Sequence, residues 1–249
     1  MLGTDVSGVI EKIGMDVTKF KIGDAVIGSL DWNKQGAYAE FVASEEKFLA
    51  TKPKNLTFQE ASAIPMTSLT AWQGVFNKLG LVKNEKIVIQ AAAGGVGLFA
   101  LQFAKWAGAF VIAITSEKNS EFIKSLGADM VIDYNKIDFS EILENVDAVF
   151  DSVETEDKSF KILKKGGKYV GISSLSIPIS KKLIAQYDVS ASKYLFKSNN
   201  VQLEKIVKLI ESEKIKVFID KTFSITEVKE TLKYQKRGHS RGKNIIVID

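Results

Sequence analysis

The sequence contains no cysteine and a single histidine, His239. Without cysteine, a disulfide scaffold, a thiolate metal site and a cysteine nucleophile are all excluded. One histidine rules out a metal site built on several histidines and disfavours Ser-His-Asp catalysis. We expect His239 to be an exposed residue at a helix end rather than a general acid, and we expect no metal.

Arginine is almost absent, because only Arg237 and Arg241 contribute to the 34 basic residues. The net charge of +4 therefore comes from lysine, which is a poor reader of phosphates and base edges compared with arginine. We interpret the basicity as a solvated lysine surface and expect no nucleic-acid partner. The sequence also lacks an apolar run long enough to span a membrane and a signal-peptide pattern at its start. These absences predict a soluble, cytoplasmic protein.

The chain changes character near residue 57. Before it, three short apolar segments between glycine turns predict strands of a small β region, at 6–14, 20–28 and 36–43. Thr57 and Glu60 form a capping-box pattern ahead of a helix. A further helical stretch ends at Gly80, where glycine suits a helix C-cap.

After Gly80, apolar strands alternate with helices of about ten residues, which is typical of a parallel sheet covered on both faces. The predicted strands are 86–90, 109–115, 130–134, 147–152 and 168–173, and the predicted helices are 95–108, 116–128, 138–146 and 156–167. An amphipathic helix at 201–214, a strand at 216–223, a helix at 226–238 and a strand at 244–248 follow. The fold class is therefore α/β with a Rossmann-type, doubly wound parallel sheet.

The segment after the first of these strands predicts a dinucleotide site. Strand 86–90 runs directly into Ala91-Ala92-Ala93-Gly94-Gly95-Val96-Gly97, which opens a helix. Gly94 and Gly95 would let the backbone approach a pyrophosphate, Gly97 would let the helix pack on the strand, and Val96 lies in the first helical turn. Ala91 replaces the first glycine of the usual fingerprint. The alternative is an ordinary glycine-rich turn between a strand and a helix.

The end of the second strand bears on the choice of cofactor. NAD sites usually place a carboxylate there to bind the ribose 2′-hydroxyl, whereas this strand ends in Thr115-Ser116 and is followed by Glu117 and Lys118. The hydroxyls and the lysine favour a 2′-phosphate, so we predict NADPH in preference to NADH. Alternatively, Ser116 only caps the next helix, with Lys118 solvated; Glu117 would favour NADH if it turned toward the ribose.

Short blocks spread along the whole chain carry a resemblance to a known family. They are Gly3-Thr4-Asp5-Val6-Ser7-Gly8-Val9, Lys21-Ile22-Gly23-Asp24, Gly36-Ala37-Tyr38-Ala39-Glu40, Glu60-Ala61-Ser62-Ala63-Ile64-Pro65, Leu69-Thr70-Ala71-Trp72, the glycine turn, Leu126-Gly127-Ala128-Asp129, Ile132-Asp133-Tyr134 and Arg241-Gly242-Lys243. In this order they resemble the zinc-independent medium-chain dehydrogenases/reductases, in the quinone oxidoreductase (zeta-crystallin-like) branch.

The resemblance implies a partial GroES-like β (catalytic) domain at 1–66, a Rossmann cofactor domain at 67–195 and a C-terminal segment, 196–249, that returns to the first domain. It also implies further cofactor contacts: Tyr134 beside Ser116 and Lys118 at the 2′-phosphate, and Gly171, Ile172, Ser173 and Thr70 near the nicotinamide. As alternatives, Tyr134 only ends a strand and Thr70 only faces its own helix. Lys243 is expected merely to precede the closing strand.

The implied activity is transfer of a hydride from NADPH to a quinone or an α,β-unsaturated carbonyl, without a metal and without an identified catalytic side chain. The alternative is an NADPH-binding protein without turnover that acts through interaction. Two departures from the family stand out. Glu154 replaces a glycine near the cofactor cleft, and the β segment that precedes Leu2 in relatives is not present in this sequence. We therefore expect exposed strand edges that favour aggregation or an unusual oligomer, alongside a homodimer through the sheet edge at 188–196.

Overall fold

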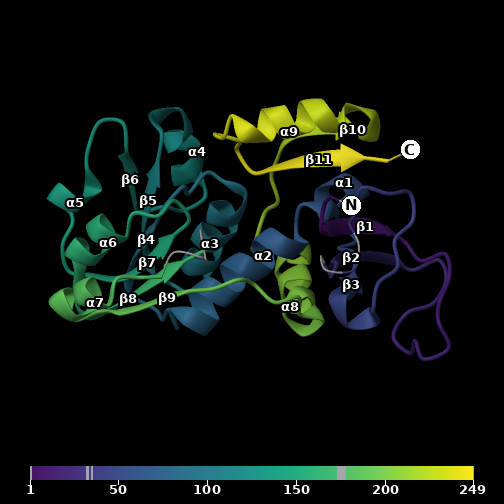
Figure 1. The fold of residues 1–249 in the computed structure, drawn as a ribbon, viewed down its shortest axis with the longest axis horizontal. Coiled ribbons are helices and arrows are strands. Elements are labelled where there is room, and N and C mark those ends of the chain that lie inside the picture. Colours follow the sequence, from purple (N-terminus) through teal and green to yellow (C-terminus); the bar gives the residue numbers. More distant parts are fainter. Residues whose placement is uncertain (1, 32–33, 35, 173–177, 249) are drawn as a thin grey trace. The chain divides into compact units, whose positions relative to one another are not determined.

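The structure is a computed structural model that describes residues 2–31, 34, 36–172 and 178–248. The chain divides into two compact units (Figure 1). Unit 1 comprises Met1–Leu69 together with Phe196–Asp249, and unit 2 is the continuous segment Thr70–Leu195. The two units are described separately. The division of function between a catalytic and a cofactor domain stays a prediction.

Unit 2 is built on a six-stranded sheet in the order β6-β5-β4-β7-β8-β9, with every pair parallel. The strands are β4 (Lys86–Ile89), β5 (Phe110–Thr115), β6 (Met130–Asp133), β7 (Val146–Asp151), β8 (Leu163–Gly171) and β9 (Ser190–Lys193). The central residues of β4, β5 and β7 are buried on both faces, as the near-continuous apolar sequence predicts, whereas the edge strand β9 has no fully buried residue. The predicted α/β class with a parallel, doubly wound sheet is confirmed.

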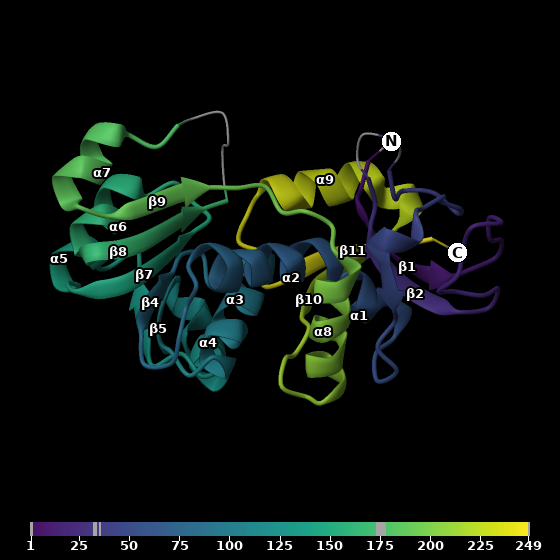
Figure 2. The same cartoon turned by 90° about the horizontal axis from the view of Figure 1, so that it is seen from below.

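Helices cover both faces of this sheet (Figure 2). They are α3 (Gly95–Trp106), η3 (Glu117–Asn119), α4 (Ser120–Ser125), α5 (Phe139–Ile142), α6 (Glu156–Ile162) and α7 (Lys181–Tyr187). On one face, Phe139 of α5, Phe160 of α6 and partly buried residues of α7 form one hydrophobic cluster with Val88 and Ile112 of the sheet. The helix α3 packs on the other face, where Phe103 is fully buried. These two apolar layers hold the sheet edge that carries the predicted cofactor residues.

Two predicted helix ends in unit 2 are wrong, because the helix expected at 138–146 ends at Ile142 and the next one also ends early. The helix expected at 156–167 ends at Ile162, and Gly166 and Gly167 lie within β8 instead of stopping the helix. The pairing of β7 with β8 shifts register here, from Val146 opposite Leu163 to Ala148 opposite Lys168. Gly166 has a φ of 71°, so these glycines allow an irregular strand start.

Unit 1 contains an antiparallel sheet of β1 (Asp5–Val9), β2 (Ala25–Ser29) and β3 (Leu49–Thr51), and a parallel pair of β10 (Ile219–Ser224) and β11 (Lys243–Val247). Its helices are η1 (Glu46–Phe48), α1 (Phe58–Ser62), α8 (Asn200–Glu211), η4 (Ile225–Glu227) and α9 (Val228–Lys236). The capping box of Thr57 and Glu60 forms as predicted. Helix α2 (Pro65–Trp72) begins at Pro65, crosses the unit boundary and continues as the π-helix η2 (Gln73–Lys78).

The strand expected at 36–43 does not form, and β3 was not predicted. The segment makes only two backbone hydrogen bonds to the start of the chain, from Ala37 to Gly3 and from Tyr38 to Leu2, each 3.0 Å long. Its later residues have no strand beside them to continue a ladder in the part of the chain that the structure describes. Alternating apolar residues are therefore not enough to form a strand here, because no edge of another strand among the described residues is available for pairing.

Candidate functional site

The carboxyl edge of the parallel sheet collects almost all of the predicted cofactor residues. The chain proceeds from β4 outward through β5 and β6, and then returns to the other side of β4 to form β7, β8 and β9. The order therefore reverses between β4 and β7, and open α/β sheets bind ligands outside the carboxyl ends of their strands at such a switch point. The loops that follow β4 and β7 are adjacent at this point because β4 pairs directly with β7.

The turn between β4 and α3 has the geometry of an anion cradle. Gly94 is the N-cap of α3 without a side chain to cap it, and its own N–H donates to the carbonyl of Ala91 at 2.9 Å. The N–H groups of Gly95, Val96 and Gly97 have no acceptor among the described residues, and the first turn contains no acidic side chain. A helix N-terminus with free amides and no carboxylate suits a phosphate. The residues present therefore fit a dinucleotide pyrophosphate.

Gly97 is required by packing. A Cβ at this position would lie 2.3 Å from the carbonyl oxygen of Ala91 and 2.8 Å from the Cα of Ala92. Both are backbone atoms, so they cannot yield as a flexible side chain would. Ala91 has a φ of 47°, in the left-handed region that glycine adopts most easily. The alanine at the first fingerprint position thus keeps the turn, at some conformational cost.

The strands β5 and β6 bring the second group of predicted residues to one place. Thr115 and Asp133 pair at the strand ends, and the N–H of Tyr134 donates to the carbonyl of Thr115 at 3.3 Å. Ser116 therefore lies next to Tyr134, whose side chain is 46% exposed. Lys118 is exposed in η3. A side-chain cap by Ser116 is not formed, because its hydroxyl accepts from the amide of Asn119 at 3.3 Å instead.

Glu117, which could have favoured NADH, pairs with a lysine that sequence reasoning did not single out. Its carboxylate lies 2.6 Å from the Nζ of Lys136, and both side chains are largely exposed. The hydrogen bond to Glu117 raises the pKa of Lys136. Lys136 follows Tyr134 by two residues, so the β6 end adds a second cation beside Lys118.

The remaining predicted residues lie at the ends of β8 and in α2. Gly171 ends β8 between Asp151 of β7 and Lys193 of β9, and the N–H of Ile172 donates to the carbonyl of Asp151 at 3.0 Å. Ser173 lies outside the described residues. Thr70 is buried in α2, and its carbonyl accepts a hydrogen bond from the hydroxyl of Tyr194. Their roles toward a cofactor stay predictions.

A buried polar network at the end of β7 was missed from the sequence. Asp151 is fully buried and accepts from the N–H of Val153 at 2.7 Å, the N–H of Thr155 at 2.6 Å and the hydroxyl of Tyr169 at 3.0 Å. Burial, and then the charge of Asp151, raise the pKa of Tyr169. The Thr155 hydroxyl also accepts from the side-chain amide of Gln90 at 2.9 Å. This network fixes the loop after β7 against the end of β4.

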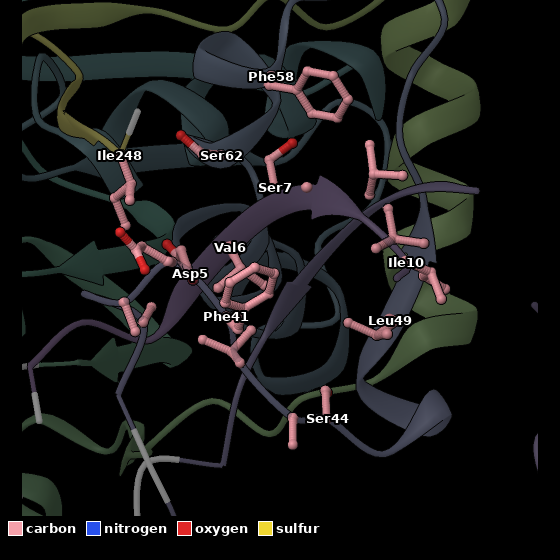
Figure 3. A pocket seen from close by; sticks show the side chains of 18 of the residues that line it. Asp5, Val6, Ser7, Ile10, Phe41, Ser44, Leu49, Phe58, Ser62 and Ile248 are labelled. Carbon is pink, nitrogen blue, oxygen red and sulfur yellow. The ribbon is translucent and has the colours of Figure 1, made fainter. Parts of the chain in front are cut away.

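Unit 1 contains a separate open hollow of about 1920 Å³ (Figure 3). Side chains of β1, of the segment around Phe41 and of α1 surround it, and they include Asp5, Ser7 and Phe58. The Ser7 hydroxyl is buried without a hydrogen-bond partner among the described residues, and Phe41 is 73% exposed. None of the predicted cofactor residues lines this hollow.

Asp5 connects three segments of unit 1. Its carboxylate accepts from the N–H of Met66, in the first turn of α2, at 3.0 Å and lies 3.4 Å from the Nζ of Lys243 at the start of β11. Lys243 therefore does more than precede the closing strand. His239 is exposed just after α9, as predicted.

In the described part of the chain, no helix is long and apolar enough to cross a membrane. The same residues contain no group of three or more His, Cys, Asp or Glu side chains that could hold a metal ion.

Two family models match the chain. Residues 1–54 match the alcohol dehydrogenase GroES-like domain, and residues 126–246 match a family described as zinc-binding dehydrogenase. The second description names zinc, whereas the sequence has no cysteine and one histidine.

Individual relatives cover nearly the whole chain. A 2-methylene-furan-3-one reductase of Solanum lycopersicum is 38% identical over 98% of this chain, which spans 62% of that protein. An NADPH-dependent alkenal/one oxidoreductase, chloroplastic, of Arabidopsis thaliana is 34% identical over 98% of this chain and 63% of its own length. The solved quinone oxidoreductase of Coxiella burnetii superposes with a TM-score of 0.91 at 31% identity, covering 98% of this chain and 78% of that one.

Proposed function

Because the chain belongs to the medium-chain dehydrogenase/reductase family, we propose that it is an NADPH-dependent oxidoreductase that reduces quinones or α,β-unsaturated carbonyls without a metal. The observation that carries the proposal is the β4–α3 turn, where three consecutive amides have no acceptor among the described residues and the backbone leaves no room for a Cβ at Gly97. The names of the relatives support the same class of acceptor.

The chain's own residues would bind and orient the cofactor, which supplies the hydride when bound. The amides of Gly95, Val96 and Gly97 would hold the pyrophosphate. Ser116, Lys118 and Tyr134 would hold the adenosine 2′-phosphate, with Lys136 as an additional cation beside them. At the other half of the site, Gly171, Ile172 and Ser173 would line the nicotinamide, together with Thr70. The protein would promote hydride transfer mainly by positioning the nicotinamide against the acceptor.

The preference for NADPH rests on the charges at the ends of β5 and β6. Lys118 and Lys136 are cationic, and the carboxylate of Glu117 is engaged by Lys136. Lys118→Met should weaken NADPH binding by about three- to tenfold and leave NADH binding unchanged, since only NADPH has the phosphate. Lys124→Met removes an exposed charge in nearby α4 and serves as the matched control. An equal loss of affinity for both cofactors in Lys118→Met, or tighter binding of NADH by the unaltered protein, would contradict the preference for NADPH.

Turnover separates an enzyme from a protein that only binds the cofactor. The assay follows the oxidation of NADPH with phenanthrenequinone and with an enone such as 3-buten-2-one, in the presence of a metal chelator. Oxidation with either acceptor is the expected result. Binding of NADPH without oxidation by any quinone or enone would leave the alternative of a non-catalytic NADPH-binding protein.

A homodimer and a cytoplasmic location complete the proposal. Strand β9 lies at an end of the six-stranded sheet in the described chain, so its outer edge is open to pairing with a second copy. Light scattering coupled to size exclusion tests the dimer, and a monomer at all concentrations would refute it. The Arabidopsis relative is named as chloroplastic, so fractionation of the source cell must decide the location.

A further inference from the structure

Glu154 is an acidic residue in a backbone conformation that favours glycine. It lies in the loop that follows β7, its φ is 61°, and its side chain is exposed. A residue with a side chain is strained in the left-handed region, because its Cβ approaches the following carbonyl oxygen. No ion pair of Glu154 occurs among the residues that the structure describes. An exposed, uncompensated carboxylate in a strained conformation calls for an explanation.

The loop holds Glu154 in a fixed position. Asp151 accepts from the N–H groups on both sides of it, Val153 at 2.7 Å and Thr155 at 2.6 Å. The hydroxyl of Ser152 donates to the carbonyl of Gln90 at 3.2 Å, and the Gln90 side chain binds Thr155. Glu154 is therefore anchored through its neighbours to the end of β4, directly beside the switch point of the sheet.

The neighbouring charges leave the carboxylate of Glu154 unbalanced. The next acidic residue, Glu156, lies 2.5 Å from the Nζ of Lys193, and both of these side chains are mostly buried. Asp151 is fully buried beneath the loop and is occupied by its hydrogen bonds. Glu154 thus adds a net negative charge to the carboxyl edge of the sheet.

The position of Glu154 relative to the switch point determines which half of a bound dinucleotide its charge would affect. In a doubly wound sheet, each half supports one mononucleotide of a dinucleotide. The β4–α3 turn and the ends of β5 and β6 form the predicted adenosine half, so β7, β8 and β9 belong to the nicotinamide half. A nicotinamide ring carries a positive charge when oxidised and none when reduced. A fixed carboxylate near it stabilises only the oxidised ring.

We propose that the carboxylate of Glu154 increases the affinity of this protein for the oxidised cofactor relative to its affinity for the reduced cofactor. The inference rests on the proposed function, because it requires a nicotinamide cofactor at this edge. It deepens that function by assigning to one residue the balance between the two redox forms. The strain at Glu154 is then the cost of placing a charge where glycine would suit the backbone better.

The test compares equilibrium binding of both redox forms to Glu154→Gln and to a matched control. Glutamine keeps the size of the side chain and removes the charge. The control is Glu144→Gln, which removes an exposed carboxylate just before β7, at the opposite end of the same strand. Dissociation constants for NADP⁺, NADPH, NAD⁺ and NADH are measured by calorimetry, and thermal unfolding verifies that both variants fold.

We expect Glu154→Gln to weaken binding of the oxidised form relative to the reduced form by about three- to tenfold, as a partly screened unit charge predicts. High salt should shrink the effect, and Glu144→Gln should not show it. An unchanged ratio in Glu154→Gln would overturn the inference while the proposed function stands. Equal tightening of both forms would also overturn it, because Glu154 would then act on the phosphates. Absence of binding by the unaltered protein would refute the proposed function itself.

Discussion

The pairing of Asp5 with Lys243 predicts a loss of stability that depends on pH when Lys243 is replaced by methionine. The Asp5 carboxylate is 11% exposed and the Lys243 side chain 21% exposed, so neither charge is well solvated. Methionine keeps much of the apolar stem but removes the cation. The carboxylate would remain buried, with the N–H of Met66 as its principal donor.

The sign of the pH dependence follows from the pKa of Asp5. Burial raises this pKa above 3.8, and the charge of Lys243 opposes that rise. Because the folded protein holds the proton more tightly than the unfolded chain, ionisation of Asp5 lowers stability as the pH rises through this window. Lys243→Met raises the pKa further. The variant should therefore lose about 2–3 kcal/mol at pH 7, and less than about 1 kcal/mol near pH 4, where a larger fraction of Asp5 carries a proton.

Urea unfolding at both pH values measures this difference, and hydrogen exchange of peptides from β1 and β11 locates it in unit 1. Asp5→Asn combined with Lys243→Met should recover most of the loss at pH 7, since no buried charge remains. Lys124→Met breaks an exposed pair with Glu121 and should cost less than about 0.5 kcal/mol at either pH. A loss that is equal at pH 7 and pH 4, or no larger than that of Lys124→Met, would refute the reasoning.

Three further predictions concern unit 2. Gly97→Ala should destabilise the chain by about 1–3 kcal/mol, because its Cβ would clash with backbone, and it should abolish cofactor binding. Gly94→Ala should nearly retain the stability, because Gly94 has a φ of −76° and a Cβ there would lie 3.3 Å from the Ala91 oxygen. Calorimetric scans and cofactor titrations of both variants check this. Ala91→Gly should stabilise by about 0.5–1 kcal/mol and raise the melting temperature by a few degrees, because glycine adopts a φ of 47° without strain; a lower melting temperature would contradict it. Tyr194→Phe should cost about 1 kcal/mol by leaving the buried carbonyl of Thr70 without this donor, as seen in urea unfolding; unchanged stability would show that the bond contributes nothing.

Periodicity in the sequence was enough to predict unit 2. Continuous apolar runs identified the strands because both faces of a parallel sheet are buried, and the glycines after β4 located the turn into α3. Since the carboxyl ends of parallel strands meet at one edge, the predicted residues after β4, β5, β6 and β8 also came together. Their assignment to parts of a cofactor stays a prediction.

Contacts between distant segments could not be predicted in the same way. The strand expected at 36–43 has no pairing strand along most of its length within the described residues, and a local pattern contains no information on pairing. Lys243 gives no local sign of its contact with Asp5, which lies at the other end of the chain. Asp151, at the end of a strand, could have suggested a polar network, but its partner Tyr169 comes from the next strand.

Both central strands of unit 2 are followed by a residue with strained backbone at the switch point. Ala91 follows β4 and Glu154 follows β7, and both have the positive φ that glycine adopts freely. Alanine at the first position adds only a methyl group, so glycine should improve stability there without changing binding. Glutamate at the second position adds a charge, so glycine there should improve stability and also change the balance of redox forms. If both substitutions stabilise the fold but only the one at Glu154 alters that balance, the strain at the two positions has different origins.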